Sequence, residues 1–147
     1  MKHRIAALAM AMLAVTAFSG IASAAHVTTL TTSLTGSEEV GSGDKNGKGY
    51  VELYLSVNGT ICYEAKVQSI GREIVGAHIH LGAAGTNGGI VVNLNPAGAT
   101  VTGNMAENCV IASAELAAAI VANPSDYYVN VHTPTYPGGA IRGQLGD

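Results

Sequence analysis

Residues 50–67 have the sequence YVELYLSVNGTICYEAKV, in which two strand-like runs flank an Asn-Gly pair. In the first run, residues 50–57, apolar and polar side chains alternate, and alternation of this length is typical of a half-buried β-strand. Asn58 and Gly59 both tolerate the positive φ of a type I′ turn, so the pair indicates a tight hairpin. The return strand is expected at residues 61–67.

Short apolar runs separated by glycine, asparagine, aspartate and proline continue beyond this hairpin. Such spacing is typical of an all-β domain. Further strands are expected at residues 74–81, 90–94, 126–133 and 140–145. One helix is expected at residues 113–122, because alanine is dense there, Ser113 can cap it and Asn123-Pro124 ends it. The predicted fold is therefore mainly β, an antiparallel sandwich or Greek-key-like barrel with one short α-helix.

The N-terminal segment differs in composition from the rest of the chain. A basic start at residues 2–4 precedes an uncharged apolar run at residues 5–21 and a small-x-small site at residues 22–24, an order typical of a secretory signal peptide. A retained membrane anchor is the alternative, but 17 residues are few for a span of about 20. We predict a signal peptide at residues 1–24, one domain at residues 25–147, and a secreted or periplasmic protein with no membrane insertion after cleavage.

Charge and cysteine content limit the partners and suggest a covalent link. Cleavage would leave 123 residues with five basic and ten acidic side chains, a formal net charge of −5. Without a basic patch, nucleic acid and anionic membranes are poor partners. Cys62 and Cys109 both lie in the exported part without CxxC spacing, which favours a structural disulfide over a cysteine metal ligand. It would close a loop of 46 intervening residues and stabilise the fold by about 3–4 kcal/mol.

Three histidines lie in two short motifs, GAHIHLG and YYVNVHT. Because alternate side chains of a strand share a face, His78 and His80 project together, and Asn130 shares a face with His132. Imidazole suits copper and zinc, and three histidines are enough for a trigonal or open four-coordinate site. If the two strands are neighbours, the sequence predicts a metal site formed by His78, His80 and His132, with copper preferred to zinc. Asn130 could then fix a histidine tautomer through a hydrogen bond.

Two further features accompany these motifs. The connector at residues 82–89 is too glycine-rich for a helix and too long for a tight hairpin, and it is expected beside the histidine pair. Arg142 has the strand parity opposite to Ile141, which favours a structural ion pair with Glu64 on an adjacent strand over the alternative of a ligand-binding arginine.

The alternative interpretation is structural, because hydrogen-bonded histidines are ordinary on the polar face of an antiparallel sheet. The chain would then be an extracellular module that binds an extracytoplasmic protein and no metal. No serine or cysteine lies in a recognisable activated motif, and the carboxylates form no evident acid-base pair, so the sequence does not predict an enzyme. Redox catalysis at copper would require an open ligand position.

Three segments resemble a known family: AHIH with its glycine-rich loop, PSDYYVNVHT, and YPGGAIRGQL near the C-terminus. Over residues 29–145 the chain is similar to the CHRD domain, which is named for chordin and also occurs as single-domain exported bacterial proteins. The resemblance implies an extracytoplasmic β-sandwich or β-barrel. Chordin binds secreted growth factors, whereas the role of the single bacterial domains is poorly defined. The resemblance therefore implies the fold more than the function. A looser similarity to copper/zinc superoxide dismutases implies no dismutase activity, because a bridging histidine and the zinc loop are not evident.

Overall fold

A computed structural model describes residues 26–71, 73–95 and 105–146. The predicted signal peptide lies outside these ranges. Within them the chain forms one antiparallel eight-stranded sheet, one α-helix and two 3-10 turns, which confirms the predicted fold class. None of the helices in the described ranges is long and apolar enough to span a membrane.

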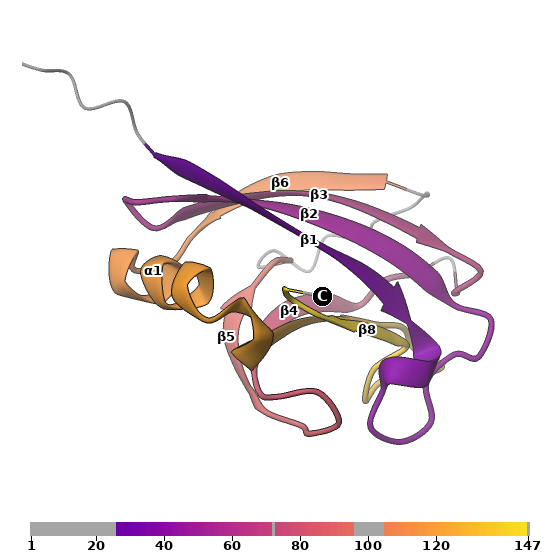
Figure 1. Ribbon diagram of the computed structural model, residues 1–147. Coiled ribbons are helices and arrows are strands. Elements are labelled where there is room, and N and C mark those ends of the chain that lie inside the picture. The colour runs from indigo at the N-terminus through magenta and orange to yellow at the C-terminus, as the bar shows by residue number, and fades with distance from the viewer. Residues whose placement is uncertain (1–25, 72, 96–104, 147) are drawn as a thin grey trace, which may run out of the picture.

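The strands follow the order β5-β4-β7-β8-β1-β2-β3-β6 across the sheet. Their bounds are β1 Val27–Thr35, β2 Lys48–Ser56, β3 Thr60–Gln68, β4 Gly76–Leu81, β5 Gly89–Asn93, β6 Met105–Ile111, β7 Tyr127–His132 and β8 Ile141–Gln144. The sheet folds over on itself, so that β1, β2, β3 and β6 form one layer above β4, β5 and β8 (Figure 1). The result is close to a barrel. The sheet bends between the two layers where β1 pairs with β8, and this pairing has one register pair, Thr35 with Arg142.

The predicted hairpin is confirmed, but its turn type is not. β2 and β3 pair antiparallel, with Leu55 opposite Ile61. Of the two turn residues only Gly59 has a positive φ, of 90°. Gly59 N donates to Ser56 O at 3.0 Å, and Thr60 N donates to Asn58 Oδ1 at 2.9 Å. The loop therefore has the form of a type I turn followed by a left-handed glycine, and it is longer than the predicted type I′ turn.

The sequence did not predict β6, whose MAENCVI segment lacks a clear alternation. Its register with β3 places Cys62 directly opposite Cys109, and the two form the predicted disulfide. The pairing with β3 thus makes a strand of a segment that has little strand signal of its own.

The predicted helix is confirmed as α1, Ala114–Ala122. Ser113 Oγ accepts a hydrogen bond from Leu116 N at 3.1 Å, which is the expected N-cap. Ala117 and Ile120 are its buried side chains, and the helix packs against β2 and β3. The 3-10 turn η2, Pro124–Asp126, then leads into β7.

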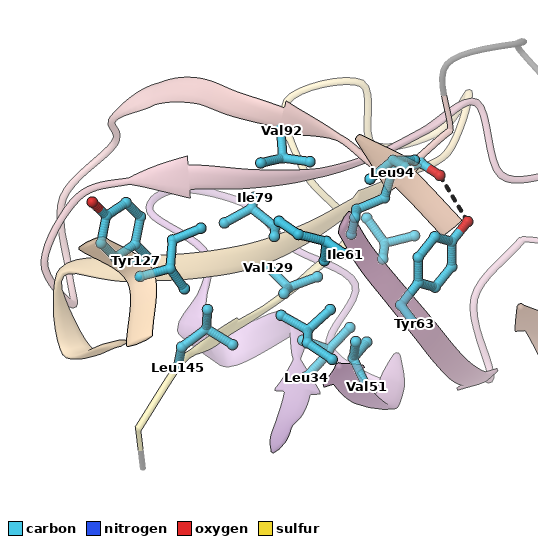
Figure 2. Close-up of a cluster of buried hydrophobic side chains, with 14 of the residues drawn as sticks. Leu34, Val51, Ile61, Tyr63, Ile79, Val92, Leu94, Tyr127, Val129 and Leu145 are labelled. Atoms are coloured by element: carbon cyan, nitrogen blue, oxygen red, sulfur yellow. Dashed lines mark hydrogen bonds between the residues drawn. The ribbon is translucent and has the colours of Figure 1, made fainter. Parts of the chain in front are cut away.

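The hydrophobic core lies between the two layers. Ile79 and Val129 from the lower layer meet Val51 and Ile61 from the upper one (Figure 2). The hydroxyl of Tyr63 donates to the Leu94 carbonyl at 2.7 Å, so its polar end is paired at the edge of the core (Figure 2). The parity predicted for β4 and β7 is confirmed by the core. Ile79, which lies between His78 and His80, is a core residue, and so are Val129 and Val131, which flank Asn130.

Candidate metal centre

The two histidine motifs lie on neighbouring strands, as the metal hypothesis requires. β4 and β7 pair antiparallel, with His78 opposite Asn130 and His80 opposite Tyr128. His132 is opposite Gly76, two positions from His78 on the same face. All three imidazoles therefore emerge on the side of the sheet that faces away from the core.

The three rings converge. One ring nitrogen of each histidine lies within 4.8 Å of the other two. His78 Nδ1 and His132 Nε2 are only 3.1 Å apart. With metal–nitrogen bonds of about 2.0–2.1 Å, this separation corresponds to a ligand–metal–ligand angle of roughly 100°, close to that of a tetrahedral or square-planar site. A ring nitrogen of His80 lies within 4.8 Å of the other two, close to the span of about 4.2 Å that two such bonds allow.

Backbone carbonyls fix the tautomers of two rings. His80 Nδ1 donates to Gly88 O at 3.0 Å, and His132 Nδ1 donates to Pro137 O at 2.9 Å. A carbonyl only accepts, so both Nδ1 atoms carry hydrogen and both Nε2 atoms of the neutral rings have a lone pair that can bind a metal or accept a hydrogen bond. This is the arrangement that orients histidine ligands in metal sites.

The third ring is positioned by a glycine. A Cβ at Gly76 would lie 3.0 Å from His78 Cε1, so a side chain there would press on the imidazole. Because neutral His132 can only accept at Nε2, His78 Nδ1 donates to it in the metal-free protein. For His78 Nδ1 to bind a metal, the hydrogen of this ring would have to move to its Nε2.

All three imidazoles are held neutral. Burial is the largest cause of the lowered pKa of each ring. It brings the pKa of His78 to about 4, with further lowering by His132 and His80. Arg142 also lowers the pKa of His80, against the hydrogen bond to Gly88. Neutral imidazole is the form that binds metals, so protons compete little at pH 7.

The loop at residues 82–88 covers this face and is fixed by β8. Arg142 donates to Thr86 O at 2.6 Å and to Ala83 O at 3.0 Å. Gln144 donates to Gly82 O at 2.8 Å. The predicted position of the glycine-rich connector beside the histidines is thus confirmed. Since this loop ends at the carbonyl that orients His80, β8 helps to place that ring.

The predicted pair between Arg142 and Glu64 is wrong. Glu64 lies on β3, and both β1 and β2 separate that strand from β8. Parity placed both residues on polar faces, but parity alone does not give the order of strands. Arg142 is only 1% exposed and lies under the loop instead.

Tyr128 joins the histidine cluster to this buried guanidinium. Its ring stacks on His80 with a centroid distance of 4.7 Å and an interplanar angle of 8°. Arg142 Cζ lies 3.4 Å from the centroid of Tyr128, a cation–π contact. The Tyr128 hydroxyl accepts a hydrogen bond from Gly88 N at 3.2 Å. The ring and the loop therefore fix His80 from two sides.

Asn130 does not make the hydrogen bond to a histidine that was predicted for it. Its Nδ2 donates to Glu39 Oε1 at 2.6 Å, while carbonyls orient the histidine rings. Burial raises the pKa of Glu39 to about 7, partly offset by Arg142. Gly139 has a φ of 139°, and a Cβ there would fall 2.4 Å from Glu39 Oε1, so this glycine admits the carboxylate. No motif pointed to Glu39, because it stands in a polar connector.

The fold and this face define an antiparallel β domain with three neutral histidines converging under its loops. The chain belongs to the CHRD domain family, whose model matches residues 30–145. This confirms the resemblance seen in the sequence. Comparison with curated proteins and with solved structures gave no match.

Proposed function

We propose that this protein is an exported CHRD-domain protein that binds one transition-metal ion, copper in preference to zinc, through His78, His80 and His132. The observation that carries the proposal is His80 Nε2, which is buried and has no hydrogen-bond partner among the described residues. An unpaired buried nitrogen is unfavourable unless something else satisfies it. A metal ion shared with two neighbouring imidazoles would do so.

The donor set supports copper. Three neutral imidazoles form a nitrogen-rich site, and Cu²⁺ exceeds Zn²⁺ in affinity for such sites. The carbonyls of Gly88 and Pro137 orient two of the ligands. Burial lowers the pKa of each ring, so the imidazoles are neutral at pH 7 and a metal ion need not displace a proton. The basic, apolar and small-residue order at the N-terminus supports export, because it is typical of a signal peptide.

Calorimetric titration of the mature protein with Cu²⁺, and in parallel with Zn²⁺, tests this function. We expect one equivalent of Cu²⁺ to bind, and a variant carrying His78→Ala, His80→Ala and His132→Ala to lose affinity at least 100-fold. Circular dichroism would establish that the variant is folded. His26→Ala is the matched control, because His26 is exposed and lies outside the cluster. It also removes a histidine near the new N-terminus that could bind copper on its own.

The outcomes separate the two interpretations of the histidines. Saturable binding that survives His26→Ala and is lost in the folded triple variant supports the metal site. Absence of saturable binding by the wild-type protein would discard it and favour a protein-interaction module with structural histidines.

A further inference from the structure

A second buried atom on this face lacks a partner. Among the described residues, Asn130 Oδ1 and His80 Nε2 are the buried side-chain nitrogen and oxygen atoms without a hydrogen bond. Asn130 is only 3% exposed and His80 9%. Buried amide oxygens are nearly always paired, so the two atoms call for a common explanation.

The register places Asn130 beneath the histidine cluster. His80 is opposite Tyr128, four residues along β7 from His132, a separation of about 13 Å along a strand. The rings of His80 and His132 nevertheless have centroids only 6.5 Å apart. They therefore lean toward each other over the intervening pair, which is His78 with Asn130. The amide lies at the base of the space on which the imidazoles converge.

The orientation of the amide is set from the side of β8. Its Nδ2 donates to Glu39, whose carboxylate lies against Gly139, just before β8. In this contact Glu39 Oε1 is the acceptor, so the amide directs its nitrogen toward Glu39. The oxygen occupies the other corner of the planar amide and points away from Glu39. β4, with His78 and His80, lies on that other side of β7.

We propose that Asn130 Oδ1 is a fourth ligand of the metal ion, completing a set of three imidazole nitrogens and one amide oxygen. Amide oxygens, as in glutamine, serve as weak, long axial ligands in some copper sites. One ion would satisfy both unpaired atoms. Glu39 then acts as a positioning residue that holds the amide in the binding orientation. The inference rests on the proposed function, since it adds a ligand to the same site.

Nuclear magnetic resonance tests the ligand directly. Zn²⁺ is the probe, because it is diamagnetic, and the full mature protein is labelled with ¹³C and ¹⁵N at asparagine. We expect the side-chain ¹³Cγ of Asn130 to shift as one equivalent of Zn²⁺ is added. The signal of Asn58 in the β2–β3 turn should stay in place and serves as an internal control.

A pair of variants gives a second measurement. Asn93 also lies opposite His78, on the β5 side, but it is exposed and its Oδ1 accepts a hydrogen bond from Asn95 N. We expect Asn130→Ala to weaken Zn²⁺ binding about 10- to 100-fold and Asn93→Ala to change it less than threefold. The resonance experiment on the wild-type protein remains decisive if Asn130→Ala does not fold.

The result that overturns the fourth ligand differs from the one that overturns the site. If one equivalent of Zn²⁺ binds through the histidines while the Asn130 signal stays unmoved and Asn130→Ala binds equally well, Asn130 is not a ligand. The three-histidine site would then stand. If the wild-type protein binds neither Zn²⁺ nor Cu²⁺, both proposals fail together.

Discussion

The two faces of the layer formed by β4, β7 and β8 are covered by different kinds of contact. Its inner face carries Ile79, Val129 and Ile141, which pack against the opposite layer. Its outer face carries histidines, Asn130 and Arg142, and loops cover it. The inner face is buried by apolar contact, and the outer face by hydrogen bonds to backbone carbonyls.

The difference shows that the outer face contributes less to stability than the inner face. Apolar side chains gain free energy from burial, whereas a buried polar group is unfavourable unless it is paired. Arg142 and Gln144 meet this condition through the loop carbonyls. His80 Nε2 and Asn130 Oδ1 do not meet it within the described residues. A face that retains unpaired polar atoms at its centre is better suited to binding than to stability.

Two neighbouring residues provide the strongest test of this contrast. Ile79 faces the core and is fully buried, whereas His80 faces the loops. We expect Ile79→Ala to lower the free energy of unfolding by about 2–5 kcal/mol. His80→Ala should change it by only about 1 kcal/mol, because it removes one hydrogen bond together with one unpaired nitrogen. Urea denaturation of the metal-free variants measures both values.

Metal titration completes this comparison. Under the proposed function, Ile79→Ala should still bind one equivalent of copper below its unfolding temperature, and His80→Ala should not. Equal losses of stability in the two variants would show that the two faces are not energetically distinct.

The inner face could be predicted from the sequence because it depends on local periodicity. Alternation in residues 50–57 and around the AHIH motif indicates which side chains share a face, and the core confirms this for β2, β4 and β7. Helix α1 also followed from local signals, its alanine content and its serine cap. β6 was missed because its strand character comes from pairing with β3 and the disulfide.

The outer face could be predicted only in part. Strand parity grouped His78 with His80, but that β4 and β7 are neighbours is a property of the whole sheet. The groups that orient the rings, Gly88 O and Pro137 O, are backbone atoms in loops and leave no mark on residue type. Glu39 reaches the site from a connector 91 residues before Asn130. Contacts of this kind depend on loop conformation.

The second prediction concerns how the loop is held over the site. We expect Arg142→Met to lower the free energy of unfolding by about 2 kcal/mol, because the carbonyls of Ala83 and Thr86 lose their buried donor. Metal affinity should fall about tenfold, since the loop then holds the Gly88 carbonyl less firmly against His80. Calorimetry and urea denaturation measure the two effects.

Lys66→Met is the control for this substitution, because Lys66 is an exposed cation on β3, away from the loop. It should leave metal affinity unchanged. A tenfold loss with Lys66→Met as well would mean that net charge, and not the position of the loop, controls binding.

The smallest expected effect is a dependence of metal-free stability on pH that belongs to the outer face. The pKa of His78 is about 4 in the folded protein, because burial lowers it from the ordinary value of 6.5. Between these values the unfolded chain binds more protons, so stability falls as the pH drops from about 6.5 to 4. Allowing for partial exposure of the ring, we expect a loss of about 1–2 kcal/mol. Glu39 opposes this trend, because its raised pKa favours the folded state as the pH falls from about 7 to 4.5.

Comparison of the wild-type protein with His78→Gln isolates the histidine contribution, because both proteins keep Glu39 and the other carboxylates. Urea denaturation of the metal-free proteins at pH 7 and pH 4.5 should show the larger acid-induced loss in the wild type. The glutamine cannot gain a proton in this range, so its variant should lose less stability by the amount that the histidine contributes. Equal losses in the two proteins would mean that the outer face does not hold His78 in the neutral form, and protons would then compete with a metal ion near pH 6.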